Sequence, residues 1–196
     1  MAGAAVSTKM RSIPELTTAL FGESLTIDEV FGRLEIDEPP GSPSERSPAA
    51  LWVGSVGYEQ HKDHAEFARL VRRAGVERLI DVRELPISRR RGFAKSALST
   101  AMADVGVEYV HIKALGNPKP FRDLYKQGQV AEGRRSYERH LLNVQRPALE
   151  GLVPLLREKR SALMCFEHDP AVCHRTVIVQ ALREQLGVEL DVAEIG

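Results

Sequence analysis

The chain has 196 residues, and its 27 lysines and arginines balance 27 aspartates and glutamates, so the formal net charge is zero. Hydrophobic residues make up 43% of the sequence, which is ordinary for a globular protein and sufficient for a single core. No run approaches the ~20 apolar residues of a membrane-spanning helix, the first residues lack the apolar stretch of a secretory signal, and neutrality disfavours a protein that coats nucleic acid in bulk.

Residues 1–50 differ in composition from the rest and are interpreted as an N-terminal extension. Thr26 and Glu29 form a capping box in front of apolar residues at helical spacing, which predicts one short amphipathic helix. The segment 37–48 is rich in proline and serine and has no apolar anchor, so it is expected to be a linker. The remainder, residues 51–196, is expected to form one α/β domain.

From residue 51 onward, short apolar runs alternate with stretches at helical spacing. Strands are expected at 51–57, 78–83, 107–112, 161–166 and 188–195. Helices are expected at 61–74, 94–105, 136–144, 147–159 and 170–186, and the stretch 115–133 is less regular. Strands separated by helices are typical of βαβ units, so the predicted fold is α/β: a three-layer sandwich with a mostly parallel five-stranded sheet, Rossmann-like in kind.

Polar side chains follow the predicted strands where they end. In an open parallel sheet, ligands bind in the crevice beyond the carboxyl ends of the strands. Four of the five predicted strands end in titratable or hydrogen-bonding groups: Tyr58, then Asp81 and Arg83, then His111, then the run 165–169. We therefore expect these groups to meet in one pocket.

The segment 165–175 predicts the start of a helix that can bind an anion. Asp169 is a good N-cap and Pro170 a good first helical residue, so the helix is expected to begin here, with Cys173 to Arg175 in or just after its first turn. The unpaired amides and positive dipole end of such a turn favour an anion or a thiolate, and an arginine adds a fork for phosphate or carboxylate.

The cysteines and histidines of this segment allow three interpretations. The preferred one is a catalytic pocket, with Cys173 or Cys165 as nucleophile and His174 or His168 as base. The second is that both cysteines are small core residues. The third is a tetrahedral metal site made of the same four residues. Because Cys173 and His174 would be helix neighbours pointing about 100° apart, no metal ligand is assigned.

The segment 83–95 concentrates positive charge. It has one acidic residue, Glu84, and five basic ones: Arg83, Arg89, Arg90, Arg91 and Lys95. Such a segment suits recognition of phosphates on a nucleotide or a nucleic-acid backbone, although it can also be a solvated basic loop. Asp81, just before it, is either paired with an arginine or kept as a base.

The order of these residues along the chain resembles the family called domain of unknown function 488. The matching groups are Gly57-Tyr58, Asp81-Val82-Arg83 with Pro86 and Ser88, Tyr109 and His111 with Leu115-Gly116, Tyr137, and Met164-Cys165 with Glu167, Asp169 and Cys173-His174-Arg175. The resemblance covers about residues 51–196. It implies that nine residues form the family's motif set: Asp81, Arg83, Ser88, His111, Cys165, Glu167, Cys173, His174 and Arg175. Many relatives have a Thr-Ile-Gly-His-Ser pattern at the first strand, and its histidine is missing here.

We therefore expect an enzyme, a hydrolase or transferase, that acts on a phosphate-bearing small molecule or a nucleic acid. The candidate catalytic residues are Asp81, Glu167, Cys173 and His174, and the candidate substrate-binding residues are Tyr58, Arg83, Ser88, His111 and Arg175. The alternatives are a non-catalytic nucleic-acid or partner-binding module that uses the 83–95 face, and a metal or redox site built on Cys165 and Cys173. Free thiols, a cytoplasmic location and no membrane partner are expected, while cofactor and oligomeric state stay open.

Overall fold

The computed structural model describes residues 50–196, and the helix and linker expected before residue 50 lie outside the described residues. The described part contains a five-stranded, all-parallel sheet with the strand order β3-β2-β4-β1-β5. The strands are β1 (Leu51–Gly57), β2 (Arg78–Asp81), β3 (Glu108–His111), β4 (Ser161–Cys165) and β5 (Leu190–Ile195). None of the helices in residues 50–196 is long and apolar enough to cross a membrane.

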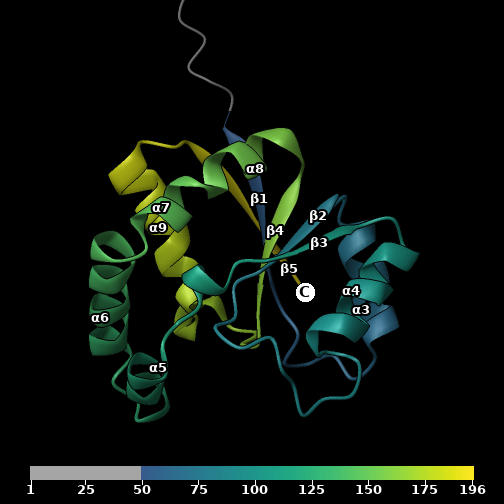
Figure 1. Cartoon of the computed structure of the whole chain (residues 1–196), viewed down its shortest axis with the longest axis horizontal. Coiled ribbons are helices and arrows are strands. Elements are labelled where there is room, and N and C mark those ends of the chain that lie inside the picture. Colours follow the sequence, from purple (N-terminus) through teal and green to yellow (C-terminus); the bar gives the residue numbers. More distant parts are fainter. Residues whose placement is uncertain (1–49) are drawn as a thin grey trace, which may run out of the picture. The chain divides into compact units, whose positions relative to one another are not determined.

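Helices cover both faces of the sheet, which confirms the predicted three-layer α/β fold (Figure 1). One face carries α3 (His64–Arg73) and α4 (Lys95–Asp104). The other face carries the later helices: α5 (Lys119–Lys126), α6 (Val130–Asn143), α7 (Arg146–Glu150), α8 (Leu152–Glu158) and α9 (His174–Leu186).

Two apolar clusters join the three layers because side chains alternate between the faces of each strand. On β4, Leu163 belongs to the cluster under α6 to α9, whereas its neighbours Ala162 and Met164 belong to the cluster under α3 and α4. All five residues of β4 are buried. The strand is therefore buried on both faces.

Helix boundaries in the stretch 115–159 differ from the sequence-based expectation. The predicted helix 147–159 is two helices, α7 and α8, which meet at Gly151. The stretch 115–133 contains the whole of α5. Its start was not predicted, because Pro118 and Pro120 lie there and proline usually indicates the end of a helix. Helix α6 begins at Val130 rather than at residue 136. The irregular stretch is therefore mostly helical, and this matters below because α5 contributes to the site.

The strand order fixes where a crevice can form. The connections that leave β1 and β2 pass through α3 and α4 on one face, whereas the connection that leaves β4 passes through α9 on the other. Strand β4 lies between β1 and β2. The order differs from the 3-2-1-4-5 order of a Rossmann fold, but the same rule holds: a crevice opens where neighbouring connections diverge, here beyond the carboxyl end of β4.

Candidate functional site

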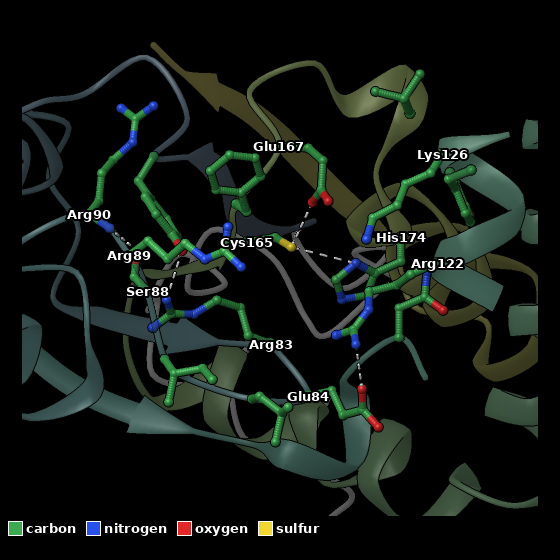
Figure 2. A pocket seen from close by; sticks show the side chains of 17 residues that line it. Arg83, Glu84, Ser88, Arg89, Arg90, Arg122, Lys126, Cys165, Glu167 and His174 are labelled. Atoms are coloured by element: carbon green, nitrogen blue, oxygen red, sulfur yellow. Dashed lines mark hydrogen bonds and ion pairs between the residues drawn. The ribbon is translucent and has the colours of Figure 1, made fainter. Parts of the chain in front are cut away.

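A cavity of about 820 Å³ lies at this point, beyond the carboxyl ends of β1, β2 and β4 (Figure 2). Each of the three strands contributes a wall residue: Tyr58 follows β1, Arg83 follows β2, and Cys165 ends β4. Further wall residues come from the segment 84–90, from α5 and from the turn between β4 and α9. Side chains from three strand ends thus meet around one cavity, but Asp81 and His111, which were expected there as well, do not line it.

One group of polar residues, here called the Asp81 network, consists of Asp81, Arg83, Tyr58 and Tyr109. Their side chains hydrogen-bond to one another and to the protein backbone. The carboxylate of Asp81 is fully buried and accepts hydrogen bonds from the guanidinium of Arg83 and from the hydroxyl of Tyr109. The remaining guanidinium nitrogen, Nη1, donates to the Tyr58 hydroxyl and to the carbonyl of Phe93. Every polar group of the network therefore has a partner within the protein.

Burial and charge shift the titration of this network. Burial opposes the charge on Arg83, but the hydrogen bond to Asp81 and its negative charge outweigh that effect and raise the pKa of the guanidinium. Burial and the same carboxylate raise the pKa of Tyr109. Near neutral pH the Arg83 guanidinium therefore stays charged and the Tyr109 hydroxyl stays protonated. Asp81 does not line the cavity, so its placement does not support the expected role as a base.

The turn between β4 and α9 takes a path that the sequence analysis did not expect. Residues Pro170–Val172 form a 3₁₀ turn capped by Asp169, and α9 begins only at His174. Cys173 is the N-cap residue with extended backbone angles (φ −116°, ψ 145°). Because Cys173 is not helical, the argument that it must diverge from His174 by a helical rotation is wrong.

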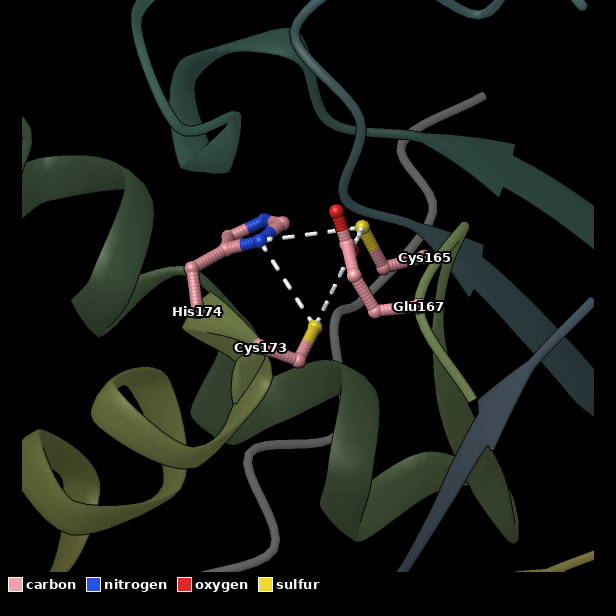
Figure 3. A group of neighbouring side chains, drawn as sticks. All are labelled: Cys165, Glu167, Cys173 and His174. Carbon is pink, nitrogen blue, oxygen red and sulfur yellow. Dashed lines mark hydrogen bonds between the residues drawn. The ribbon is translucent and has the colours of Figure 1, made fainter. Parts of the chain in front are cut away.

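The side chains at this turn converge into a compact group, here called the Cys165 cluster: Cys165, Glu167, Cys173 and His174 (Figure 3). One ligand-type atom from each residue lies within 4.8 Å of the others. The thiol of Cys165 donates to Glu167 Oε2 at 2.8 Å, and that of Cys173 lies 3.5 Å from the same oxygen. His174 Nδ1 lies 3.6 Å from the first sulfur and 3.8 Å from the second.

The far side of the His174 ring fixes which nitrogen faces the sulfurs. Its Nε2 lies 2.9 Å from the carbonyl oxygen of Val82, and a carbonyl only accepts, so Nε2 carries a proton. In the neutral ring, Nδ1 then offers its lone pair to the two thiols. The ring is buried and has Tyr137 against its edge, and the Tyr137 hydroxyl is itself anchored to the carbonyl of Leu115.

Titration within the cluster follows from burial and from these contacts. Burial raises the pKa of the Cys173 thiol well above its ordinary value. Burial also opposes charge on Glu167, but the hydrogen bond from Cys165 contributes to a net lowering of the pKa of this carboxyl. For His174, burial is outweighed by contact with Cys173, which raises the pKa of the imidazole. Because its pKa is raised, the side chain of Cys173 is a neutral thiol in this environment and therefore a poor nucleophile.

Arg175 was expected to bind substrate, but it lies behind the site. Its side chain is 1% exposed and does not line the cavity. Its guanidinium donates to Ser55 Oγ and to the carbonyls of Val56, Glu167 and His168. It therefore ties the end of β1 to the turn that carries Glu167, and it positions the cluster rather than facing a ligand.

Two further candidates differ in placement. Ser88 lines the cavity, and its hydroxyl accepts a hydrogen bond from the backbone N–H of Arg90, which shapes the basic segment. His111 does not line the cavity, because its Nε2 bonds the carbonyl of Arg83 from behind. His168 is not part of the cluster, and Glu167 takes the place that the metal interpretation gave it.

The cavity wall also holds residues that the sequence analysis missed. Helix α5 contributes Arg122, Tyr125 and Lys126, and Asn117 precedes it. Among the described residues, Asn117 Oδ1 and the Tyr125 hydroxyl are buried without a hydrogen-bond partner. Burial raises the pKa of Tyr125 to about 12, so the hydroxyl stays protonated. The spacing of Arg122, Tyr125 and Lys126 on one helical face was the available signal, but the two prolines hid the helix.

The sequence comparisons agree with the residues that build this site. A protein-family model described as "Domain of unknown function DUF488" matches residues 63–182, which is more than half of the chain and includes the Asp81 network's central pair and the whole Cys165 cluster. No curated protein and no solved structure matches the chain. The chain therefore belongs to the domain of unknown function 488 family.

Proposed function

We propose that the cavity binds a phosphate-bearing small molecule of the nucleotide type and that the protein is an enzyme, a hydrolase or transferase, acting on it. The observation that carries this proposal is the make-up of the cavity lining: arginines without a carboxylate partner, exposed apolar side chains and three residues of the Cys165 cluster border the same space. A ligand with both an anionic and a flat apolar part fits such a wall.

The cations favour an anionic ligand. Arg89 is exposed and has no ion-pair or hydrogen-bond partner among residues 50–196, and Arg90 bonds only a backbone carbonyl, that of His61. On the opposite wall, Arg122 pairs with Glu84, and Lys126 lies 3.9 Å from Asp123. Guanidinium groups bind phosphate oxygens in pairs, so free arginines at a cavity are suited to that role.

The apolar side chains favour a ligand with a planar or hydrophobic portion. Four of the five large hydrophobic side chains that are exposed within the described residues line this cavity: Leu85, Ile87, Phe166 and Val172. Phe166, 39% exposed, packs edge-on against Tyr58, so an aromatic surface faces the cavity. Apolar side chains concentrated around a concave site typically contact a ligand.

The residues that can perform chemistry lie at the same wall. Cys165, Glu167 and His174 line the cavity, whereas Asp81 and Cys173 do not. Glu167 and His174 are therefore the groups proposed to exchange protons with a bound substrate, and Asn117 with Tyr125 offers an acceptor and a donor for its orientation. Phosphoester or glycosidic cleavage is the class of reaction that this set suits.

Binding of a nucleoside monophosphate, measured by titration calorimetry, tests the proposal. A charged hydrogen bond contributes about 1.5–3 kcal/mol, so Arg89→Ala and Arg90→Ala should each weaken binding by roughly tenfold or more. Arg72→Ala is the matched control, because Arg72 is an exposed arginine in the last turn of α3 and does not line the cavity. No binding by the wild-type protein, or an equal loss in the control, would contradict the proposal.

A second candidate, a non-catalytic nucleic-acid-binding module, has one specific observation in its favour. Arg89, Arg90 and Arg91 are consecutive, and Ile87 beside them is 72% exposed. An oligonucleotide should then bind more tightly as its length grows, and its affinity should fall steeply with salt, with a slope near −0.7 for each phosphate contacted. Equal affinity for a mononucleotide and a longer strand would favour the enzyme instead.

A further inference from the structure

We propose that the Cys165 cluster binds one transition-metal ion of the zinc type, with the four residues as its ligands. The proposal concerns a different ligand from the phosphate-bearing molecule, and the cavity can bind that molecule with or without the metal. With the metal bound, Glu167 and His174 act as its ligands and do not also exchange protons with a substrate. The proposal rests on three observations: the spacing of the four donor atoms, the chemistry of the donors, and the bonds that hold them from outside.

The spacing matches a tetrahedral ion. With Zn–S of ~2.3 Å and Zn–N or Zn–O of ~2.0 Å, a sulfur ligand of a tetrahedral site lies about 3.5–3.8 Å from each of the other ligand atoms. In the cluster, three of the contacts involving sulfur measure 3.5, 3.6 and 3.8 Å. The fourth, from Cys165 Sγ to Glu167 Oε2, is 2.8 Å because a thiol proton bridges the two atoms. Exchanging that proton for a metal ion requires this one contact to lengthen.

The donor set selects the metal. Thiolate sulfur and imidazole nitrogen suit zinc and its neighbours, while carboxylate oxygen completes a four-coordinate site. Magnesium and calcium are disfavoured, because they take oxygen ligands almost exclusively. Once both thiol protons have left to solvent, the two thiolates balance the charge of a divalent cation, and the carboxylate adds a third negative charge.

Bonds from outside hold the donors in position. His174 Nε2 donates to the Val82 carbonyl, which directs Nδ1 at the sulfurs, as is usual for a histidine that ligates a metal. Arg175 binds the carbonyls of Glu167 and His168 and so fixes the turn that carries the carboxylate. The backbone of that turn lies against Gly57, where a Cβ atom would be only 1.9 Å from the Glu167 carbonyl oxygen. These contacts pre-form the site without a metal.

The position of the cluster gives the ion an accessible side. Cys165, Glu167 and His174 border the cavity, while Cys173 is buried behind them. A site with one protein ligand that can be exchanged leaves a coordination position for water or substrate, as in catalytic zinc centres. Glu167 is the ligand suited to exchange, because it lies on the cavity wall and is the only oxygen donor of the four.

The experiment measures metal binding rather than activity. Full-length protein is treated with a chelator under reducing conditions, and Zn²⁺ is then titrated in competition with a chromophoric chelator. We expect one equivalent to bind, and we expect Cys173→Ser to weaken binding by roughly 100-fold or more. His168→Ala is the matched control: its histidine lies in the same turn but outside the cluster, so its affinity should equal that of the wild type.

A second measurement covers the case in which the serine variant does not fold. Wild-type protein loaded with Co²⁺ should show the visible bands of a tetrahedral ion and a near-ultraviolet sulfur-to-cobalt charge-transfer band. Absence of that band, no stoichiometric Zn²⁺ binding, or equal Zn²⁺ affinity in wild type and Cys173→Ser would each overturn the proposal. Loss of binding in His168→Ala would overturn the assignment of Glu167 as the fourth ligand.

Discussion

The ends of β2 and β4 both carry titratable side chains, yet the two regions use them in opposite ways. In the Asp81 network after β2, the carboxylate, the guanidinium and both tyrosine hydroxyls bond one another or the backbone. In the Cys165 cluster after β4, two thiols, a carboxylate and an imidazole face one another around a common point. The first region holds a full set of bonds, and the second holds donor atoms that a metal ion can still use.

This difference distinguishes polar residues at strand ends that stabilise the fold from those that are available to bind a ligand. Asp81 is at the centre of a saturated network, so removing it should mainly change the stability of the fold. Cys173 belongs to a group with unused bonding capacity, so changing it should mainly alter ligand binding. The three substitutions below test this contrast, from the largest expected change in stability to the smallest.

Asp81→Asn should cause the largest loss of stability. The substitution leaves the buried guanidinium of Arg83 without its counter-charge, and breaking a buried ion pair typically costs about 3–5 kcal/mol. The free energy of unfolding from urea titration measures the effect. Glu84→Gln is the control: it removes the partner of half-exposed Arg122 and should cost at most about 1 kcal/mol. Equal effects of the two substitutions would remove the contrast.

Gly57→Ala should have an intermediate effect on stability and should also damage the cluster. The new Cβ would overlap the Glu167 carbonyl, so the turn must move at a cost of about 1–3 kcal/mol. Thermal unfolding and the Zn²⁺ titration should both register the change. Gly151→Ala is the control, because Gly151 has helical backbone angles (φ −64°, ψ −15°) and the nearest atom to a new Cβ would be 3.3 Å away. A Gly57→Ala protein with unchanged stability and Zn²⁺ affinity would contradict the account.

Cys173→Ser should have the smallest effect on stability when no metal is present. Serine is close in size and can still donate to Glu167, so the free energy of unfolding should change by less than about 1 kcal/mol. Added Zn²⁺ at 100 times its Kd should then stabilise the wild type by about 2.7 kcal/mol and the variant far less. Urea titrations with and without Zn²⁺ measure both quantities. A large loss in metal-free protein would place Cys173 among the supporting residues.

The sequence predicted the three-layer fold and the convergence of Tyr58, Arg83 and Cys165, but it wrongly placed Asp81, His111 and Arg175 in the same pocket. The part that was predicted rests on local signals. Strand 51–57 is an apolar run closed by glycine, and Cys165, Glu167, Cys173 and His174 lie within ten positions of one another. The strand order escaped prediction because it depends on pairing between distant segments, such as β1 with β4.

The geometry of the cluster escaped prediction for a different reason. Asp169 and Pro170 are good first residues for a helix, and they do begin a helical turn, but it is a 3₁₀ turn that ends before Cys173. The extended backbone of Cys173 lets its thiol face His174. No residue type in the segment predicts that extended conformation. Arg83 and Arg175 looked alike in sequence, and only their surroundings distinguish the one at the cavity from the one behind it.

The central claim is that the space beyond β4 is the ligand-binding site, and a crystal structure of the protein grown with inorganic phosphate tests it most directly. The account predicts a phosphate ion inside the cavity, within hydrogen-bond distance of at least two of the cationic side chains that line it: Arg89, Arg90, Arg122 and Lys126. Well-ordered phosphate bound only elsewhere on the molecule, with the cavity filled by water, would contradict it.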